Sequence, residues 1–327
     1  MSQANAVASA SRCAPPWRAP LIVAVLGLLW FWLLPDFLGL LTRIAYMALF
    51  VLALDLVVGV SGIGTLGHAA MFGIGAYSAG IVALRWYPDP LVGLVVGSAC
   101  GAFVAALSGA FLLRYQGFTF LMLTIAVLQI LQSLANKFRN WTGGDDGLSG
   151  FTVSPLLGMF RFDMKGQTAA LYALAVLVVG YYVARRVVDS PFGLSVRGIN
   201  QNRARVAALG TPVFKRLWAM YTIAGALAGA AGAVSAQSNA VVGLDSLGFT
   251  LSAEALVMLV LGGSGRLHGA LVGVVVFTLL HHTASSLNPY HWLFIIGSAL
   301  MGVVFFSPAK VWDALRRRMS RTSTGSP

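Results

Sequence analysis

The sequence has few charged residues and almost no cysteine. Only 10% of its 327 residues are Asp, Glu, Lys or Arg, against roughly a quarter in a typical soluble domain. Its two cysteines, Cys13 and Cys100, lie far apart and supply neither a disulfide framework nor a thiolate metal site. This shortage of charge excludes an ordinary soluble globular protein.

Acidic residues and catalytic motifs are also scarce. The ten acidic residues include a single glutamate, Glu254, whereas a proton-coupled transporter normally carries several carboxylates in its membrane helices. The sequence has no GxxxxGK[ST], HExxH or CxxC motif and no Ser/His/Asp arrangement. We therefore expect a protein that is not an enzyme and that binds no nucleotide, cofactor or metal of its own.

Apolar residues fill most of the chain. They make up 58% of the sequence, the mean hydropathy is +0.81, and runs of about 20 apolar residues recur. The predicted fold is an all-α polytopic membrane protein with a transmembrane domain over residues 20–307. We expect ten transmembrane helices, over residues 20–34, 43–60, 70–86, 91–113, 117–135, 167–184, 217–241, 249–261, 268–286 and 292–306. The first lacks a signal-peptide cleavage site and is predicted to stay uncleaved.

Basic residues predict the orientation. The net charge of +12 is concentrated at helix ends and in a few loops, which indicates membrane topology and not nucleic-acid binding. The loop 185–216 and the tail 308–327 are rich in Arg and Lys, so both are expected in the cytoplasm, with the N-terminal tail 1–19. The loop 136–166, which contains WTGGDDGLSG, is expected outside.

The basic loop has signals for short, capped helices. Ser190 before Pro191 is a helix-start pattern, and Asn200 or Asn202 can cap a second helix, NRARVAAL. Gly210 stands where a left-handed residue ends such a helix. On that helix Val206 and Leu209 share one face, three positions apart. Two interpretations remain: a solvated basic connector, or a docking helix for a cytoplasmic partner.

A glycine-rich segment, SGIGTLGHA over residues 61–69, interrupts the apolar runs. It matches GxGxxG, but the dinucleotide interpretation requires a preceding strand, and an apolar helix precedes it here. The alternatives are unwound backbone that re-enters the bundle or a plain turn between helices. Asp55, just before it, is expected to cap a helix or bond between helices, with a substrate contact as the alternative.

Small residues recur every fourth position in three helices, over residues 93–101, 225–229 and 269–273. Such faces permit close helix packing, either within the chain or against a second subunit.

Five ordered stretches resemble a known family. They are Ser61–Gly80, Leu123–Ala126, Thr142–Gly150, Ser190–Gly210 and Glu254–Gly273. Together they are similar to the LivM-type permease subunit of branched-chain amino acid ABC importers, over most of the chain. The resemblance implies the ABC importer permease fold, a bacterial inner-membrane location and no enzymatic activity.

The resemblance also implies partners and sites. A LivH-type second permease, two cytoplasmic ATPases that bind ATP and magnesium, and a periplasmic substrate-binding protein would complete the importer. The implied ATPase-coupling residues are Arg203, Val206, Ala207, Ala208, Leu209 and Gly210. Candidate residues of the translocation path are Asp55, Gly62, Gly64, His68, Thr124 and Gln129.

The cargo stays open at this point. The resemblance implies a branched-chain amino acid or a similar small solute, and related permeases carry urea, short amides or aromatic acids. The family often has acidic residues where this chain has Asn200, Gln201 and Asn202, or near Gln129. A self-sufficient secondary transporter is the alternative from another class, and it would have to work without ATPase subunits.

Overall fold

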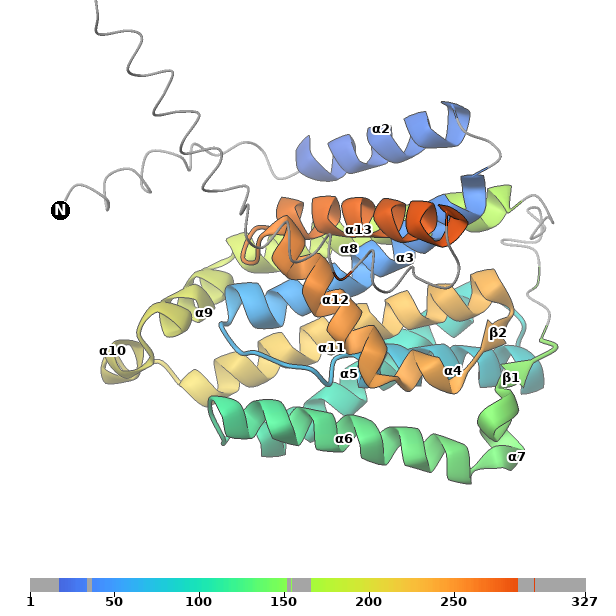
Figure 1. Cartoon of the computed structure of the whole chain (residues 1–327). Helices are drawn as coiled ribbons and strands as arrows, with labels where there is room; N and C mark the ends of the chain where they lie inside the picture. Colours follow the sequence, from blue (N-terminus) through green and yellow to red (C-terminus); the bar gives the residue numbers. More distant parts are fainter. Residues whose placement is uncertain (1–17, 34–36, 152–153, 155–165, 288–296, 298–327) are drawn as a thin grey trace, which may run out of the picture.

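A computed structural model describes residues 18–33, 37–151, 154, 166–287 and 297, in which most long helices run side by side (Figure 1). The longer helices are α2 (Arg18–Leu33), α3 (Leu38–Asp55), α4 (Ala69–Arg85), α5 (Pro90–Leu112), α6 (Phe118–Lys137), α8 (Gln167–Asp189), α9 (Pro191–Gln201), α11 (Val213–Asn239), α12 (Phe249–Gly262) and α13 (Leu267–Leu287). The shorter elements are η2 (Leu56–Val60), α7 (Arg139–Thr142), η3 (Gly144–Asp146), β1 (Leu148–Ser149), α10 (Arg203–Ala208), β2 (Val241–Val242) and η4 (Leu244–Leu247).

The predicted helical fold is confirmed over the described residues. A helix occupies each of the first nine expected positions, and six spans are long and apolar enough to cross a membrane. The segments Val23–Trp32, Ala69–Arg85 and Phe249–Gly262 are shorter apolar helices. The tenth expected helix, over 292–306, and both chain ends lie outside the described residues, so the count of ten and the cytoplasmic termini stay predictions.

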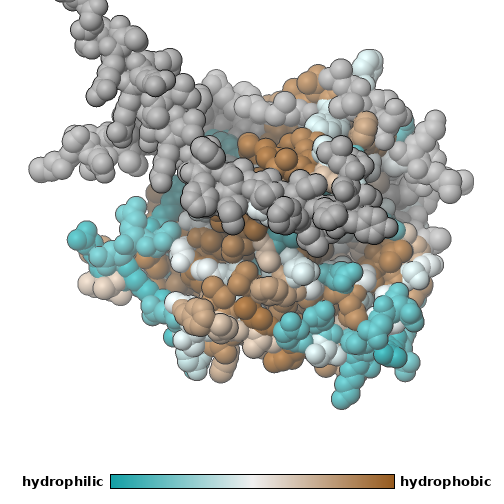
Figure 2. All heavy atoms as spheres, viewed as in Figure 1, coloured by the Kyte–Doolittle hydropathy of each residue, from teal (hydrophilic) through white to brown (hydrophobic). Residues whose placement is uncertain are grey.

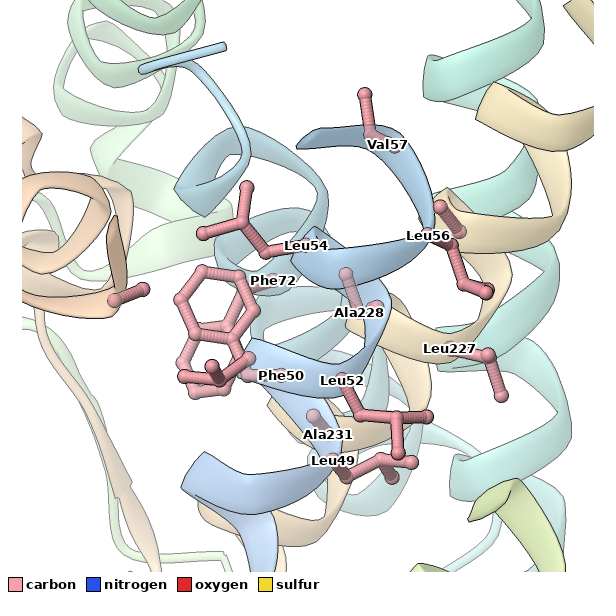
Figure 3. Packing of buried hydrophobic residues seen from close by; sticks show 14 of the residues in the cluster. Leu49, Phe50, Leu52, Leu54, Leu56, Val57, Phe72, Leu227, Ala228 and Ala231 are labelled. Atoms are coloured by element: carbon pink, nitrogen blue, oxygen red, sulfur yellow. The ribbon is translucent and has the colours of Figure 1, made fainter. Parts of the chain in front are cut away.

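Helix α3 forms the centre of the bundle because its sequence is apolar on all sides. A helix without a polar face is stable only when protein or lipid surrounds it, and 83% of the most apolar window in Leu38–Val60 is buried inside the protein. Figure 3 shows Phe50 of α3 beside Phe72 of α4, with their ring centroids 4.9 Å apart. On another side of α3 lie Leu227 and Ala228 of α11.

Glycines bring the surrounding helices close together. A Cβ atom added at Gly101 of α5 would collide with the backbone of Gly225 and Gly229 in α11, and one added at Gly97 would collide with the Ala233 side chain of the same helix. A Cβ added at Gly269 of α13 would likewise collide with the carbonyl of Gly262 in α12. The small-residue faces therefore pack within this chain, which resolves the alternative left open by the sequence.

Three details differ from the sequence expectations. Helix α8 continues to Asp189 and α11 begins at Val213, so the ends of the loop expected over 185–216 are helical. Ser190 separates α8 from α9 because its backbone is extended, with φ −74° and ψ 161°. An unexpected two-stranded antiparallel ribbon pairs Leu148 with Val242, so the expected all-α fold has one small β element.

The two ends of the bundle differ in charge. Figure 1 shows α9, α10 and the α12–α13 turn at one end, which carries most of the arginines among the described residues, and α7 at the other. At the α7 end, Arg139 pairs with Asp145 at 2.8 Å. Apolar residues cover much of the visible middle, and hydrophilic residues gather toward both ends (Figure 2). This is the surface expected of a membrane-spanning bundle.

Candidate translocation path and coupling loop

Helix α3 ends in a π-turn, η2, and not in an ordinary helix cap. The Ser61 backbone N–H donates to the Leu56 carbonyl at 3.2 Å, and the Ser61 hydroxyl donates to the same oxygen at 2.9 Å. Gly62 then has a φ of +72°, a backbone conformation that residues other than glycine rarely adopt. The helix break predicted from the glycines is confirmed, and widened helical turns of this kind are frequent at functional sites.

The glycine-rich segment folds back into the bundle before α4 begins. The His68 ring stacks on the Phe50 ring, with centroids 5.7 Å apart and planes inclined by 18°. Phe50 lies ten positions before Val60, which is about 15 Å along a helix that rises 1.5 Å per residue. The backbone of residues 61–68 therefore returns from the end of α3 to a level well inside the bundle. Of the two alternatives, the re-entering backbone agrees with the structure.

Two neighbouring helices hold this backbone in place. The Leu66 N–H donates to the Thr124 hydroxyl of α6 at 3.4 Å, and the Ala69 N–H donates to the Ser252 hydroxyl of α12 at 2.9 Å. Gly67 has no room for a side chain because its Cβ would collide with the Thr124 carbonyl. Hydroxyl side chains thus satisfy N–H groups that no helix or strand satisfies here.

His68 is the most unusual residue of the segment. Its side chain is fully buried, and within the part of the chain that the structure describes neither ring nitrogen has a hydrogen-bond partner. Buried polar atoms without partners are rare and costly, so each requires an explanation. A histidine buried inside a membrane bundle is by default a candidate for a functional site.

A cavity of about 490 Å³ opens beside the first part of the break. Its lining includes Gly62 and Gly64 of the break, Asn200 of α9 and Arg203 of α10. The turn between α5 and α6 completes it, with Tyr115, Gln116, Gly117 and Phe118. The cavity therefore brings two of the candidate path residues together with the basic loop.

Asn200 connects the basic loop directly to the end of α3. Its side-chain Nδ2 donates to the carbonyl oxygens of Gly59 and Val60, at 3.3 Å each. These carbonyls belong to the π-turn, where the last C=O groups of a helix lack partners within the helix. A Cβ at Gly62 would collide with the Asn200 amide. Asn200 is therefore a cap of η2, a function that the sequence did not reveal.

Asp55 contacts a second loop at the same place. Its Oδ1 accepts a hydrogen bond from the Gly265 backbone N–H, at 2.7 Å, in the turn between α12 and α13. Gly59 fits between them, since its Cβ would collide with both groups. The predicted bonding of Asp55 between helical elements is confirmed, and its side chain lies at this turn and not beside His68.

The basic loop folds as the capping residues predicted. The Ser190 hydroxyl accepts from the Gly193 N–H at 3.2 Å, and the Asn202 Oδ1 accepts from the Arg205 N–H at 2.9 Å. Asn202, not Asn200, therefore caps α10. Gly210 has φ +82°, the left-handed conformation expected of a helix end.

The candidate coupling residues lie on the accessible helix α10 and directly after it. None of the residues of α10 is buried; Ala207, Ala208 and Gly210 are exposed, and Leu209 is 78% exposed. Val206 packs against the core, so it does not share an environment with Leu209, which follows the last residue of α10. The expectation of one common apolar face is wrong for this pair.

Gln129 lies apart from the other candidate path residues. It is exposed on α6, in a shallow hollow with Ser133 and Lys137. Thr124 of the same helix is buried against the break. Sequence reasoning missed Asn200 as a contact of the π-turn and Ser252 as a contact of α4. Ser252 did carry a signal, because it is a polar residue within an apolar helix.

Comparison with known proteins decides the family. The family model described as branched-chain amino acid transport system / permease component matches residues 37–306. The chain belongs to this family. The resemblance to the LivM-type permeases is thereby confirmed. Together with its apolar helices, membership makes the chain a multi-pass membrane protein.

Individual relatives support the assignment. The high-affinity branched-chain amino acid permease protein LivM is 26% identical in Salmonella typhimurium and 24% in Escherichia coli, each over 280 residues and 78% of this chain. The chain covers 65% of the length of each of those two relatives. The galactose/methyl galactoside import permease MglC of Escherichia coli is 27% identical over 234 residues, or 65% of each chain. No solved structure matches the chain.

Proposed function

We propose that the chain is one permease subunit of an ATP-driven importer in the bacterial inner membrane. The observation that carries this proposal is the contact of Asn200 with the π-turn of α3. Through it, the accessible basic loop is hydrogen-bonded to the turn that directly precedes the re-entering backbone. A displacement of the loop by a partner would therefore reach the candidate path through a single side chain, that of Asn200.

The proposed assembly has four further components. A LivH-type second permease, two cytoplasmic ATPases and a periplasmic binding protein would act with this chain. ATP and magnesium would bind to the ATPases, and this chain would bind no cofactor. The coupling residues would be Arg203, Val206, Ala207, Ala208, Leu209 and Gly210, of which the exposed ones are accessible to an ATPase.

The proposed path follows the re-entering segment. Gly62 and Gly64 present backbone to the 490 Å³ cavity, and His68 places polar atoms deeper in the bundle. Closure of the ATPases would move α9 and α10, and the bond from Asn200 would draw η2 with them. Rearrangement of a few loop residues between packed helices is a common way to open and close a path.

The exposed face of α6 fits a position beside the second permease. Gln129, Ser133 and Lys137 occur at intervals of four residues, so they share one side of the helix. Polar side chains on a membrane helix usually face protein or water because facing lipid is costly. This face would line the path between the two subunits, which is how Gln129 would contribute.

The proposed cargo is a branched-chain amino acid or a similar small polar solute. The LivM relatives are named for branched-chain amino acid transport, whereas MglC and the ribose import permease RbsC are named for sugars. Urea, short amides and aromatic acids are further candidates within the same mechanism. The mechanism itself does not depend on which of these solutes the binding protein delivers.

The test compares Asn200→Ala with Gln201→Ala in the assembled importer, reconstituted in liposomes with the candidate solutes. Loss of two hydrogen bonds, each contributing roughly 0.5–1.5 kcal/mol, should lower uptake about tenfold in Asn200→Ala while ATP hydrolysis persists. Gln201 is exposed and next in sequence, so Gln201→Ala should transport normally.

Two results would contradict the proposal. Equal uptake by both variants would show that the contact with the π-turn transmits nothing. Uptake by the purified chain alone, driven by a proton or sodium gradient with no ATPase present, would favour the self-sufficient secondary transporter.

A further inference from the structure

A second cavity, of about 560 Å³, lies at the same end of the bundle but outside the candidate path. It lies between the end of α8, helix α9 and the start of α13. Three arginines from these three segments line it: Arg185, Arg197 and Arg266. We call this cavity the arginine pocket.

Positive charge exceeds negative charge in the arginine pocket. One carboxylate, that of Asp189, lines the pocket, and its Oδ2 lies 3.4 Å from the Arg185 Nε. Asp55, behind the Gly265 turn, interacts electrostatically with Arg197. Arg197 and Arg266 form no ion pair with any residue that the structure describes. Three guanidinium groups thus face two carboxylates, and the pocket can accept an anion.

Two lining residues hold the helices around the pocket together. The Tyr181 hydroxyl of α8 is hydrogen-bonded to His268 Nδ1 of α13, and the two rings stack with planes inclined by 20°. This pair ties α8 to α13 at the pocket. The pocket also includes the first residues of α13, Leu267 to Gly269, so the positive end of the helix dipole adds to the attraction for an anion.

An apolar stripe leads away from the pocket along α13. Val272 lines the pocket and is 58% exposed, and Val276 and Leu280 follow at intervals of four residues with 39% and 38% exposure. Residues at this spacing form one face of a helix. A site that combines arginines with an exposed apolar stripe matches an amphiphile and not a small ion.

We propose that the arginine pocket binds the phosphate of an anionic glycerophospholipid in the cytoplasmic leaflet. The guanidinium groups suit phosphate because they can donate two parallel hydrogen bonds to it. One acyl chain would lie along Val272, Val276 and Leu280. Basic pockets between membrane helices on the cytoplasmic side bind such headgroups in general. A free phosphate ion, or a carboxylate of a partner protein, would leave the apolar stripe unused.

The first experiment uses the unaltered full-length chain. It is purified in detergent and incubated with equal amounts of phosphatidylglycerol and phosphatidylcholine of the same acyl chains, and the retained lipid is counted by native mass spectrometry. We expect phosphatidylglycerol to be retained and phosphatidylcholine to be lost, because only the first has a net negative charge. Equal retention of the two lipids would overturn the proposal, whatever any variant does.

The second experiment tests the arginines. The double variant Arg197→Gln, Arg266→Gln should bind phosphatidylglycerol about 25-fold more weakly, since each basic residue near an anionic lipid contributes about fivefold. The matched control is Arg186→Gln, because Arg186 is exposed on the same end of α8 but lines a different cavity, with Tyr182 and Phe192. An equal loss in the control would overturn the proposal by showing that only overall charge matters.

The third experiment distinguishes the sources of phosphate. Inorganic phosphate and a phosphatidylglycerol with six-carbon chains are added as competitors at equal ionic strength. The apolar stripe predicts that both displace the long-chain lipid poorly. Displacement by inorganic phosphate at equal concentration would overturn the lipid assignment in favour of a free anion. Retention of the lipid only until ATPase subunits are added, with the pocket then occupied by a partner's carboxylate, would also overturn it.

Discussion

Among individual residues, Gly59 of η2 has no room for a side chain. A methyl group at this position would collide with the Asp55 carboxylate and with the Gly265 N–H. We expect Gly59→Ala to destabilise the protein by about 1–3 kcal/mol, as overpacking does in closely packed interiors. The measurement is thermal unfolding of the purified chain in detergent.

Gly39 provides the control for this prediction. It lies near the start of α3, in the same membrane span that η2 ends, and a methyl group there would meet no atom within 4 Å. Gly39→Ala should be neutral or stabilise by about 0.5–1 kcal/mol, because alanine loses less freedom in a helix. Equal shifts in the two variants would mean that the turn at Gly265 does not pack against α3 as described.

His68 distinguishes a functional polar group from a structural one. We expect His68→Leu to keep or raise the unfolding temperature, because it removes two buried nitrogens that lack partners. We expect uptake by the assembled importer to fall at least tenfold. Tyr77→Phe is the matched control, since it removes a buried hydroxyl without a partner in the described residues, on the far side of α4. Normal uptake by His68→Leu would remove His68 from the path.

Among the helices, α10 gives the sharpest test of docking. Ala208 is exposed, so Ala208→Asp changes no contact within the described chain, and any defect should arise at a partner. Gly210→Val has open space for its side chain but opposes φ +82°, which should cost about 1–2 kcal/mol. We expect both variants to reach the membrane normally yet lose ATPase binding and uptake.

The readouts for α10 are membrane abundance, co-purification of the ATPase, and uptake. Gln201→Asp adds the same charge to the neighbouring helix and should leave all three unchanged. If Ala208→Asp and Gly210→Val bind the ATPase and transport normally, the loop is a solvated basic connector.

The sequence predicted well those elements whose formation depends on residues close to one another in the chain. The apolar runs predicted the long helices, and Ser190, Asn202 and Gly210 cap or end their helices through atoms a few positions away. The re-entering segment was among the alternatives because glycines permit unwound backbone. Its direction was not predictable, since the stacking of His68 on Phe50 depends on tertiary packing.

The features that sequence did not predict join distant parts of the chain. Asn200 bonds to carbonyls 140 and 141 positions earlier, and nothing in its own neighbourhood specifies that partner. The ribbon of Leu148 with Val242 has two residues in each strand, too short for an alternating pattern. Gln129 was placed in the path by resemblance alone, and its exposure on α6 depends on which face the other helices cover.

At the scale of the whole molecule, the difference in charge between the two ends of the helix bundle predicts its orientation in the membrane. In a background with Cys13→Ser and Cys100→Ser, Asp146→Cys should react with an impermeant thiol reagent in intact cells. Gln201→Cys should react only after the cells are permeabilised, because the Arg-rich end faces the cytoplasm. Both positions are exposed, so accessibility within the protein does not limit either reaction. The reverse labelling would overturn the orientation.

The bond between Asp55 and Gly265 also has a consequence for biosynthesis. Its two partners are 210 positions apart. At a synthesis rate of about 5–20 residues per second, Gly265 leaves the ribosome about 10–40 s after Asp55. Throughout that interval the Asp55 carboxylate lacks this donor, and at its start the helices α8, α11, α12 and α13 that pack against α3 have not yet been synthesised. We therefore expect water or the insertion machinery to supply a donor to this carboxylate until Gly265 arrives.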